Sequence, residues 1–530
     1  MTPTTQRPGD DGRRRQPAAP AAQPPATVGE VLAALADHGG AALVSPAPPG
    51  AEAVALRDVT HDSRDAGPGV LFACRPGSRV DGHDFGAAAV AAGSPALLVE
   101  RPVDTPRPVP QLRVPSVAAA LGVAAATIHR HPSEEMVLVG VTGTNGKTTS
   151  AYLLESVLAA AGHTTGLIGT VETRIAGAAV PGVRTTPEAT DLQRLLRRMR
   201  QAGVTAAAME VSSHGLALGR VTGTRFAVAL FTNLSHDHLD FHRDLEDYFS
   251  AKASLFTPAF TRRAVINVDD PWGRRLAELA AGAGLRVDRV SASGRADADV
   301  TAVDVRGGPQ GSTFTALLDG RRVEVQTRLP GGFNVSNALQ VLAAAVAIGV
   351  PAETAARGIA ALPGVPGRME RVEAGQPFTV LVDYAHTPDS LEHVLRAAGE
   401  LRGEGARVIV VVGCGGDRDQ AKRPLMGRAA VTLADEAVFT DDNPRSEDPR
   451  AILDAIVVGA AEVPGARWRV EPDRRRAIGL ALAAAREGDV VVIAGKGHET
   501  YQELAGRTID FDDRVVAREA LETLAAGGAA

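Results

Sequence analysis

The chain has 530 residues, enough for about three domains of ordinary size. Its net charge of −6 argues against nucleic acid or an anionic membrane as a partner, and its aromatic content of 4% is too low for surfaces that stack bases. Two cysteines cannot form a disulfide framework, and no apolar run reaches the ~18 residues of a membrane-spanning helix. We therefore expect a protein of the reducing cytoplasm.

The first 133 residues divide into two regions of different composition. Residues 1–27 are rich in Pro, Ala, Arg and Gln and lack the continuous apolar core of a signal peptide, so we expect a disordered tail. Residues 28–133 alternate short helical and strand patterns, with strands expected at 97–99 and 112–114, which predicts a small α/β domain. Polar groups around Ser63 either hold a ligand or only decorate turns, and the sequence leaves both open.

Residues 136–149 read MVLVGVTGTNGKTT, an apolar strand that runs into a glycine turn and then into a helical pattern. Such a turn directs unpaired N–H groups and the positive end of the helix dipole at one spot. Lys147 adds a positive charge, and Thr148 adds a hydroxyl suited to Mg²⁺. The usual loop, G-x-x-x-x-G-K-[ST], has a glycine where this chain has Val141, and a merely solvated lysine is the alternative. We predict an ATP or GTP site at residues 143–149.

This loop opens a second region, residues 134–364. Helical stretches separate its expected apolar strands, which lie at 206–209, 227–231 and 264–268. This alternation predicts a parallel sheet. Polar residues follow the strands directly, and ligands of open α/β sheets bind at the carboxyl ends of the strands. We therefore expect Glu210 and the segment 233–238 to face the same opening as Lys147.

Two charged residues of this region have competing interpretations. Glu210 ends a predicted strand, so it either holds Mg²⁺ together with Thr148 or is a surface glutamate near a turn. Lys252 lies on an apolar helical pattern, and its local sequence favours a surface lysine whose stem covers apolar neighbours.

The segment HDHLDFH at 236–242 contains three histidines and two aspartates. His238 and His242 have the i, i+4 spacing of a zinc site on a helix, but no HExxH pattern accompanies them. Because ATP chemistry already requires Mg²⁺, we favour a phosphate-side role for His236. A structural capping role remains the alternative, especially for His242.

A third region, residues 365–530, repeats the alternation of strands and helices. The expected strands are 379–382, 408–412, 437–440 and 490–494, and the expected helices are 390–401, 424–434, 449–461 and 473–486. This order predicts a doubly wound parallel sheet. Each conspicuous polar motif follows a strand, and these motifs are DYAHTP, GCGGDRD, TDDNPRSEDP and AGKGHE. Four such motifs at one sheet edge indicate a substrate cleft.

The polar motifs of this cleft suit a zwitterionic amino acid. Arg418 offers a bidentate clamp for a carboxylate, and Arg445 offers a second guanidinium after a rigid Asn-Pro turn. Glu499 offers a carboxylate that binds an ammonium group. The alternative is a network of salt bridges within the protein.

Ten motifs together resemble those of the Mur ligases. They are TGTNGKTT, MEVSSHGL, NLSHDHLDFH, FNVSNAL, GRMERV, DYAHTPDSLE, GCGGDRD, KRPLM, DDNPRSEDP and AGKGHE, and with the N-terminal matches they extend from about residue 60 to Glu499. The resemblance implies an N-terminal domain for a UDP-sugar, a central P-loop ATPase, and a mobile C-terminal Rossmann-like domain for an amino acid. It further implies ATP as co-substrate, Mg²⁺ as cofactor, an acyl-phosphate intermediate and a place in peptidoglycan precursor synthesis.

The pattern is most similar to that of members that add meso-diaminopimelate to UDP-N-acetylmuramoyl-L-alanyl-D-glutamate, because DNPR marks them. Ser63 would contact the uridine part, while Thr185, Thr186, Ser212 and Arg220 would hold the muramoyl dipeptide. The nucleotide set would be Gly143, Thr144, Asn145, Gly146, Lys147, Thr148, Thr149, Asn337 and Arg368. The diaminopimelate set would be Arg418, Asp442, Asn443, Pro444, Arg445, Gly495 and Glu499. Lys252 would be a carbamylated lysine that binds Mg²⁺ with Thr148, Glu210 and His236.

Two positions depart from the family pattern, and several alternatives remain. The loop after Phe72 lacks the His-Gln-Ala of some relatives, and Leu218 stands where some members have glutamine. The same ligation with L-lysine, a folylpolyglutamate synthase-like ligase and a nucleotide-dependent regulatory module are the rival functions. We expect only small-molecule partners, no nucleic acid or membrane, and a monomer.

Overall fold

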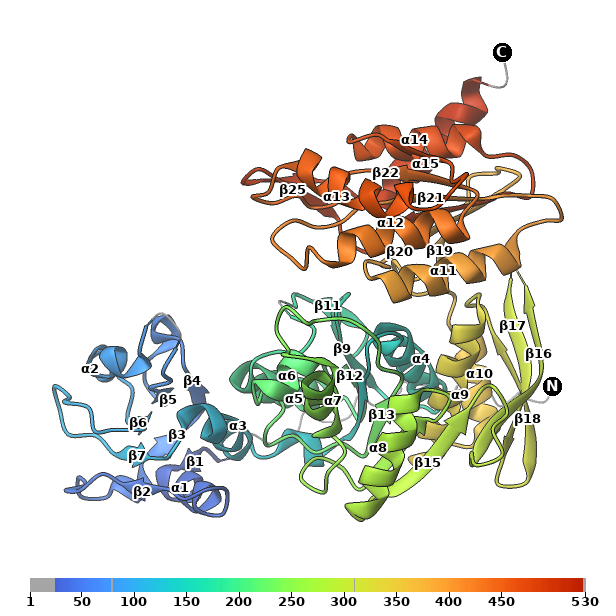
Figure 1. The fold of residues 1–530 in the computed structure, drawn as a ribbon. Helices are drawn as coiled ribbons and strands as arrows, with labels where there is room; N and C mark the ends of the chain where they lie inside the picture. The colour runs from blue at the N-terminus through green and yellow to red at the C-terminus, as the bar shows by residue number, and fades with distance from the viewer. Residues whose placement is uncertain (1–23, 78–79, 183, 309, 528–530) are drawn as a thin grey trace, which may run out of the picture.

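The computed structural model describes residues 24–77, 80–182, 184–308 and 310–527, which form three α/β units in chain order (Figure 1). The three-unit α/β architecture expected from the sequence is therefore confirmed. Residues 1–23 of the expected tail lie outside the described residues, whereas β1 (Ala26–Thr27) pairs with β3 (Ala55–Leu56). The predicted domain boundaries stay predictions, and each of the three large sheets lies within one predicted range.

The N-terminal unit is a five-stranded sheet with helices on both faces. Because successive side chains of a strand alternate between faces, Leu98 packs in the cluster with α1 and α3, whereas Leu97 packs in the cluster with α2. The strand order is β2-β7-β6-β5-β4, with β2 (Ala42–Leu43), β4 (Asp58–Thr60), β5 (Val70–Ala73), β6 (Ala96–Val99) and β7 (Gln111–Arg113). The helices are α1 (Val28–Ala36), α2 (Gly86–Ala91) and α3 (Val117–Ile128).

The central unit contains an eleven-stranded sheet in the order β11-β10-β9-β12-β8-β13-β14-β15-β16-β17-β18. The strands from β9 to β16 in this order are parallel, and antiparallel strands extend both edges. The parallel strands are β8 (Val137–Thr142), β9 (Thr165–Ile168), β12 (Ala206–Glu210), β13 (Val228–Phe231), β14 (Arg263–Asn267), β15 (Arg286–Ser291) and β16 (Val300–Gly308). The edge strands are β10 (Thr173–Ile175), β11 (Ala178–Val180), β17 (Gly311–Leu318) and β18 (Arg321–Thr327).

Helices cover both faces of this central sheet. Leu138 and Val139 are neighbours on β8, yet Leu138 packs against α5, α7 and α8 while Val139 packs against α4, α9 and α10. Burial on both faces explains why the parallel strands are continuous apolar runs. The helices are α4 (Lys147–Ala160), α5 (Ala189–Gln201), α6 (Ser213–Ala217), α7 (Leu245–Ala253), α8 (Pro271–Gly282), α9 (Gly332–Ala347) and α10 (Ala352–Ala361).

The C-terminal unit is a six-stranded sheet in the order β19-β20-β24-β21-β22-β23, and the predicted doubly wound pattern is confirmed. Its strands are β19 (Glu370–Arg371), β20 (Thr379–Asp383), β21 (Val408–Val412), β22 (Glu436–Phe439), β23 (Trp468–Val470) and β24 (Val490–Ala494). Helices α11 (Pro388–Leu401), α12 (Lys422–Leu433) and α13 (Pro449–Ala461) cover one face, and α14 (Arg474–Ala484) and α15 (Asp513–Gly527) cover the other. A hairpin of β25 (Tyr501–Leu504) and β26 (Arg507–Asp510) follows β24.

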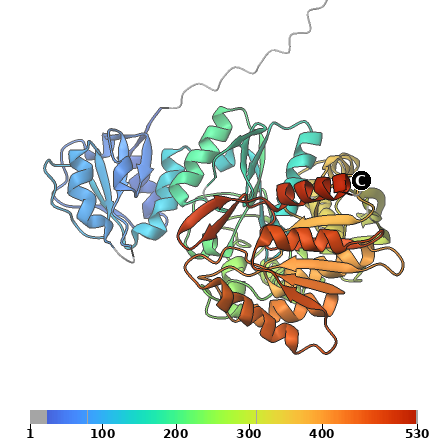
Figure 2. The same cartoon turned by 90° about the horizontal axis from the view of Figure 1, so that it is seen from above.

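The C-terminal unit lies over the central unit, and α11 is the helix it turns toward that unit (Figure 1). The N-terminal unit lies to one side in both views, where α3 packs against α5 (Figures 1 and 2). None of the helices among the described residues combines the length and the apolar character that a membrane crossing requires.

Candidate active site

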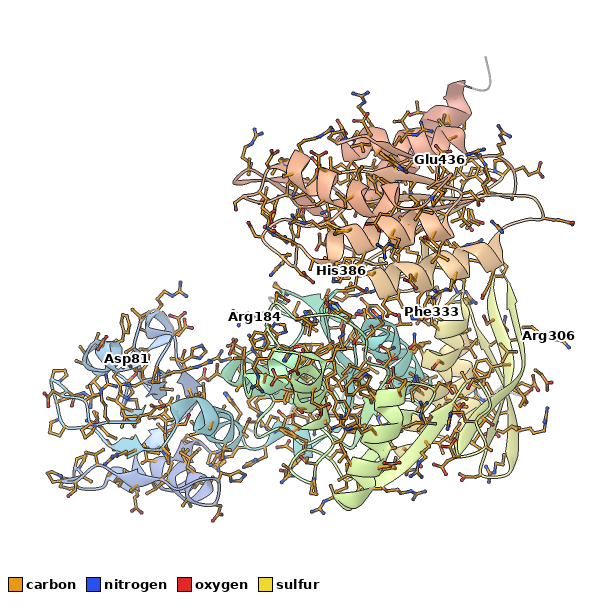
Figure 3. The ribbon with its side chains drawn as sticks, in the orientation of Figure 1. Asp81, Arg184, Arg306, Phe333, His386 and Glu436 are labelled. Carbon is orange, nitrogen blue, oxygen red and sulfur yellow. The ribbon has the colours of Figure 1, made fainter. Side chains whose placement is uncertain are left out.

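A cavity of about 1740 Å³ lies between the central and C-terminal units. Arg184 and Phe333 of the central unit and His386 of the C-terminal unit line it, at the level where the two units face each other (Figure 3). Both parallel sheets contribute residues that follow their strands, as the carboxyl-end rule predicts. The predicted site residues that line the cavity are Thr144, Asn145, Gly146, Lys147, Thr148, Thr149, Thr185, Thr186, Glu210, Ser212, Arg220, His236, Asn337, Arg368, Arg418, Asp442, Asn443, Arg445, Gly495 and Glu499.

Four predicted site residues are not in the cavity wall. Gly143 is the first residue of the phosphate loop, Lys252 donates a hydrogen bond to its carbonyl oxygen, and Pro444 lies between two residues that line the cavity. Ser63 begins a short 3₁₀ turn of the N-terminal unit, which the cavity does not reach. The structure therefore brings the nucleotide, dipeptide and amino-acid sets together, apart from the residue expected at the uridine.

The predicted phosphate loop joins β8 to α4 through two glycines with positive φ. Gly143 has φ 148° and Gly146 has φ 87°, and a Cβ at Gly146 would collide with Asn337 Oδ1. Such backbone angles are accessible to glycine with little strain. Asn233 anchors the loop, since its Oδ1 accepts a hydrogen bond from Asn145 N at 2.9 Å.

Lys147 opens helix α4 and is half-buried rather than merely solvated. Its Nζ donates to the carbonyl oxygens of Gly143 at 2.9 Å and Thr144 at 2.7 Å. Burial lowers the pKa of Lys147, against the opposing charge of Glu210. The ammonium and the N-terminus of α4 thus present positive charge at the same end of the cavity.

Glu210 is almost wholly buried at the end of β12, so the surface interpretation of this residue is wrong. Its Oε2 accepts hydrogen bonds from Thr148 Oγ1 at 3.1 Å and Thr170 Oγ1 at 3.0 Å. The carboxylate oxygens of Glu210 and the hydroxyl oxygen of Thr148 are the type of ligand atom that Mg²⁺ prefers, and both residues line the cavity. The residues present therefore fit a magnesium ion. Among the described residues there is no group of three or more His, Cys, Asp or Glu side chains placed to hold a metal.

Lys252 is 1% exposed, so the local prediction of a surface lysine is also wrong. Helix α7 turns this face toward the phosphate loop, where Lys252 Nζ donates to Gly143 O at 2.7 Å and lies 4.5 Å from the Tyr248 ring centre. Burial, helped by the charge of Lys147, lowers the pKa of Lys252 well below its ordinary value. Lys147 and Lys252 thus converge on a single carbonyl oxygen.

Two histidines of the segment 236–242, His236 and His238, line the cavity. His236 is exposed at the edge of the cavity, and its predicted metal role stays a prediction. His238 has φ 56° and lies 4.9 Å from the ring of His214. Burial lowers the pKa of His238 to about 4, aided by Lys147 and Lys252 and opposed by Asp237. The left-handed backbone of His238 had no signal in the local sequence spacing.

His242, for which a structural role was the alternative interpretation, is buried. Its Nδ1 lies 3.5 Å from Asp247 Oδ2, and its ring centre lies 5.1 Å from that of Tyr248. These contacts are those of a packed core histidine.

The predicted dipeptide set forms one connected cluster. Thr186 Oγ1 donates to Glu210 O at 3.0 Å and accepts from Ser212 N at 3.0 Å. Arg220 donates to Thr186 O and pairs with Glu188 Oε1 at 2.9 Å. This cluster therefore adjoins the main-chain carbonyl of Glu210 at the end of β12.

The predicted amino-acid set surrounds a buried lysine that the sequence interpretation missed. Lys496 Nζ donates to Asn443 Oδ1 at 3.0 Å and to Glu499 Oε2 at 3.1 Å, and lies 3.7 Å from Asp442 Oδ1. Asn443 Nδ2 also donates to Glu499 Oε2 at 2.9 Å. Burial and the nearby Asp442 raise the pKa of Glu499. Glu499 Oε2 thus takes part in an ion pair within the protein, which was the alternative to ligand binding. Its other oxygen, Oε1, accepts no hydrogen bond from the residues that the structure describes.

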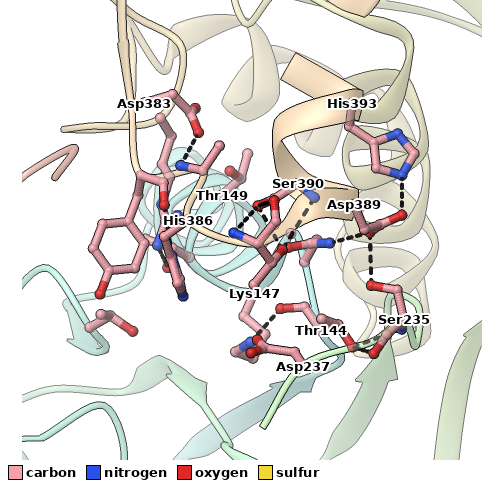
Figure 4. Close-up of a pocket in the computed structure, with 18 of the residues that line it drawn as sticks. Thr144, Lys147, Thr149, Ser235, Asp237, Asp383, His386, Asp389, Ser390 and His393 are labelled. Carbon is pink, nitrogen blue, oxygen red and sulfur yellow. Dashed lines mark hydrogen bonds and ion pairs between the residues drawn. The ribbon is translucent and has the colours of Figure 1, made fainter. Parts of the chain in front are cut away.

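A second residue missed from the sequence links the two units. Asp389, at the start of α11, accepts hydrogen bonds from Asn145 Nδ2 at 2.8 Å and from Ser235 Oγ at 2.7 Å, and lies 3.4 Å from His393 Nε2 (Figure 4). It belongs to the motif DYAHTPDSLE, whose position after a strand was the available signal. The phosphate loop is therefore tied to the C-terminal unit.

Three family descriptions match the chain. They are the Mur ligase middle domain at residues 141–345, the Mur ligase glutamate ligase domain at 367–497, and the Mur ligase family catalytic domain at 56–145.

Curated relatives and solved structures are similar over most of the chain. A Streptomyces avermitilis protein named UDP-N-acetylmuramoyl-L-alanyl-D-glutamate–2,6-diaminopimelate ligase is 50% identical over 472 residues, covering 88% of this chain and 92% of the relative. The Solibacter usitatus protein of the same name is 46% identical, covering 93% and 98%. A solved structure of a ligase with that name is 33% identical and has a TM-score of 0.66. The match covers 89% of this chain and 96% of that structure's chain. Mycobacterium tuberculosis folylpolyglutamate synthase, 20% identical with a TM-score of 0.57 over 76% and 94%, shares the fold.

Proposed function

Because this chain belongs to the Mur ligase family, we propose that it uses ATP to add meso-diaminopimelate to UDP-N-acetylmuramoyl-L-alanyl-D-glutamate. One observation carries the proposal: the phosphate loop and the segment containing Asn443 and Arg445 line the same cavity. The names of relatives up to 50% identical support this choice of substrates. The reaction would supply a cytoplasmic peptidoglycan precursor, and the enzyme would act as a monomer.

In the first step the terminal D-glutamyl carboxylate attacks the γ-phosphorus of ATP, which forms an acyl phosphate and releases ADP. Two anions must approach each other, so positive side chains are needed around the reacting oxygens. We propose Lys147, Arg220 and Arg368 for this screening, and Arg368 Nη2 donates to Thr148 Oγ1 at 3.2 Å.

In the second step an amine of diaminopimelate attacks the activated carbonyl carbon, the amine loses a proton, and phosphate leaves. Arg418 and Arg445 would hold the carboxylates of the amino acid, and Glu499 would accept hydrogen bonds from an ammonium group. The second carboxylate distinguishes diaminopimelate from lysine, and Arg445 is the cation proposed to recognise it. Because the C-terminal unit covers the cavity, it would also exclude water from the acyl phosphate.

Magnesium would neutralise phosphate charge when bound, and Thr148 and Glu210 are the residues proposed to hold it. The family resemblance adds Lys252 as a carbamate, and the burial of Lys252 against the loop supports this addition. A histidine of the 236–242 segment would complete the set. We retain His236 as the sequence prediction, and His238 lines the same cavity.

One assay tests the proposed function. ADP release is measured with the UDP-muramoyl dipeptide and a panel of diamino acids, and the product is identified by mass. We expect stoichiometric ADP and tripeptide with meso-diaminopimelate. Turnover with L-lysine alone, folate-dependent phosphate release, or nucleotide binding without peptide product would each contradict the proposal.

A further inference from the structure

Strand β25 lies alongside the segment that carries the proposed specificity arginine. Gln502 Nε2 donates to Asp442 O at 2.8 Å, and Glu503 N donates to Asn443 Oδ1 at 3.0 Å. The hairpin thus contacts two residues of the amino-acid pocket from behind. One contact reaches the main chain of the pocket segment, and the other reaches the Asn443 amide that Lys496 and Glu499 also hold.

The same strand holds the backbone of Arg445. This residue has φ 53°, a left-handed conformation that is unfavourable by about 1–2 kcal/mol for a residue with a Cβ. Arg445 N donates to Glu503 O at 3.1 Å, and Ala505 N donates to Arg445 O at 3.0 Å. The hairpin therefore maintains a backbone angle that Arg445 adopts rarely on its own.

The Arg445 guanidinium is also held in place from the side of the hairpin. Its Nε lies 2.7 Å from Glu503 Oε2, and its Nη1 donates to Gly416 O at 2.8 Å. A guanidinium has five N–H donors, so these two contacts leave three donors of the same plane. Arg445 lines the cavity, whereas Glu503 is not part of the cavity wall. The carboxylate therefore orients the guanidinium without taking the space of a ligand.

We propose that Glu503 is a positioning residue that orients Arg445 toward the second carboxylate of the incoming amino acid. This inference rests on the proposed function and deepens it, because it assigns part of the choice of a dicarboxylic diamino acid to a residue outside the binding motifs. Orientation matters here since a bidentate guanidinium–carboxylate pair is directional. Without the Glu503 carboxylate, Arg445 keeps its charge and its contact with Gly416 O but loses the second contact that fixes its direction.

The test compares Glu503→Ala and Glu503→Gln in the full-length enzyme. We expect Glu503→Ala to raise the KM for meso-diaminopimelate about tenfold, with kcat and the KM for ATP nearly unchanged. Glu503→Gln keeps an oxygen atom at the position that lies 2.7 Å from Arg445 Nε, so its KM should stay within about threefold of the parent value. Asp510→Ala, a change of the same charge on the exposed neighbouring strand β26, is the matched control and should leave all constants unchanged.

L-Lysine separates positioning from general disruption, because it lacks the second carboxylate. A positioning role predicts that Glu503→Ala lowers kcat/KM for diaminopimelate and leaves that for lysine unchanged, so that discrimination falls. An equal loss with both amino acids, or an unchanged or lowered KM for diaminopimelate, overturns the inference. If the parent enzyme forms no product with diaminopimelate, the proposed function itself fails, which is a distinguishable result.

Discussion

Asp389 of the C-terminal unit accepts a hydrogen bond from Asn145 of the phosphate loop at 2.8 Å. The two residues are 244 positions apart in the chain, and the bond crosses the boundary between the unit proposed to bind ATP and the unit proposed to bind the amino acid. Ser235 joins the same carboxylate at 2.7 Å, so one side chain ties two loops of the central unit to α11. The docking of the two units is thereby coupled to the shape of the nucleotide loop.

Replacing Asp389 should therefore affect catalysis more than folding. We expect Asp389→Ala to lower kcat about tenfold or more and to raise the KM for ATP, because hydrogen bonds to a charged group are worth about 1.5–3 kcal/mol. Steady-state ADP release measures both constants. Glu392→Ala, on the exposed side of the same helix, is the control. Normal kinetics in Asp389→Ala would show that this contact is dispensable.

Lys147→Ala should abolish turnover and leave the fold intact. The side chain supplies the positive charge at the phosphate loop, and removal of one such group typically lowers kcat by about 10²–10³. Its hydrogen bonds go to carbonyls of its own loop, so the hydrophobic cores are not disturbed. ADP release checks the loss of turnover, and thermal unfolding of the same preparation checks that the fold is intact. Activity near the parent level would count against the nucleotide assignment.

Arg445→Ala should weaken the binding of the amino-acid substrate and leave that of ATP nearly unchanged. Loss of a charged, bidentate contact predicts a rise of about 10- to 100-fold in the KM for meso-diaminopimelate, whereas the KM for ATP should change little. The two constants are obtained by varying each substrate at saturating levels of the others. An unchanged preference for diaminopimelate over L-lysine would remove Arg445 from the specificity argument.

Acid should weaken the junction between the N-terminal and central units. Asp58 on β4 lies 2.9 Å from Arg194 of α5 and 3.1 Å from His129, the residue that follows α3. Burial alone would raise the pKa of Asp58, but hydrogen bonds from His129 and Arg194 outweigh it and lower the pKa to about 2. The unfolded-state pKa is about 3.9, so this contribution is present above pH ~4 and is lost as the pH falls toward 2.

The corresponding experiment compares the free energy of unfolding of the parent and Asp58→Asn between pH 7 and pH 2. The parent should be more stable by about 2 kcal/mol at pH 6, and the difference should disappear near pH 2. A difference that is independent of pH would show that the charge of Asp58 is not what matters.

The C-terminal unit contains a fully buried ion pair between Arg474 of α14 and Asp513 of α15. Arg474 Nη2 lies 2.7 Å from Asp513 Oδ2 and also donates to Ala494 O, the last residue of β24. Removing one partner of a buried pair leaves an uncompensated charge, so Arg474→Met should lower the free energy of unfolding by about 3–5 kcal/mol. Arg475→Met, which removes the exposed neighbour, should change it by less than about 1 kcal/mol. Denaturant unfolding followed by circular dichroism measures both, and equal effects would contradict the argument.

The fold was predictable because its strands are buried on both faces and read as continuous apolar runs. For the same reason, residues that follow the strands could be placed at a common edge, and Glu210, Asn443 and Glu499 do line one cavity. The spacing of residues along a helix does not reveal which part of the protein packs against each of its faces. Lys252 reads as a surface residue until the phosphate loop is folded over it.

Contacts between distant segments account for the other omissions. Lys496 Nζ donates to Asn443, which lies 53 residues away in the chain, and the local sequence gives no sign of this contact. The left-handed backbone of His238 and its contact with the His214 ring likewise have no signal in the local spacing. Only the family resemblance pointed to Lys252 as a functional residue before the structure.

The central and C-terminal sheets each have their own hydrophobic cores, yet the cavity needs residues from both. Warming can therefore part the two units while each core stays packed. Thermal inactivation should then precede the melting of secondary structure and reverse fully on cooling. Such an enzyme loses activity when its central and C-terminal units separate, at a lower temperature than the one at which either unit unfolds.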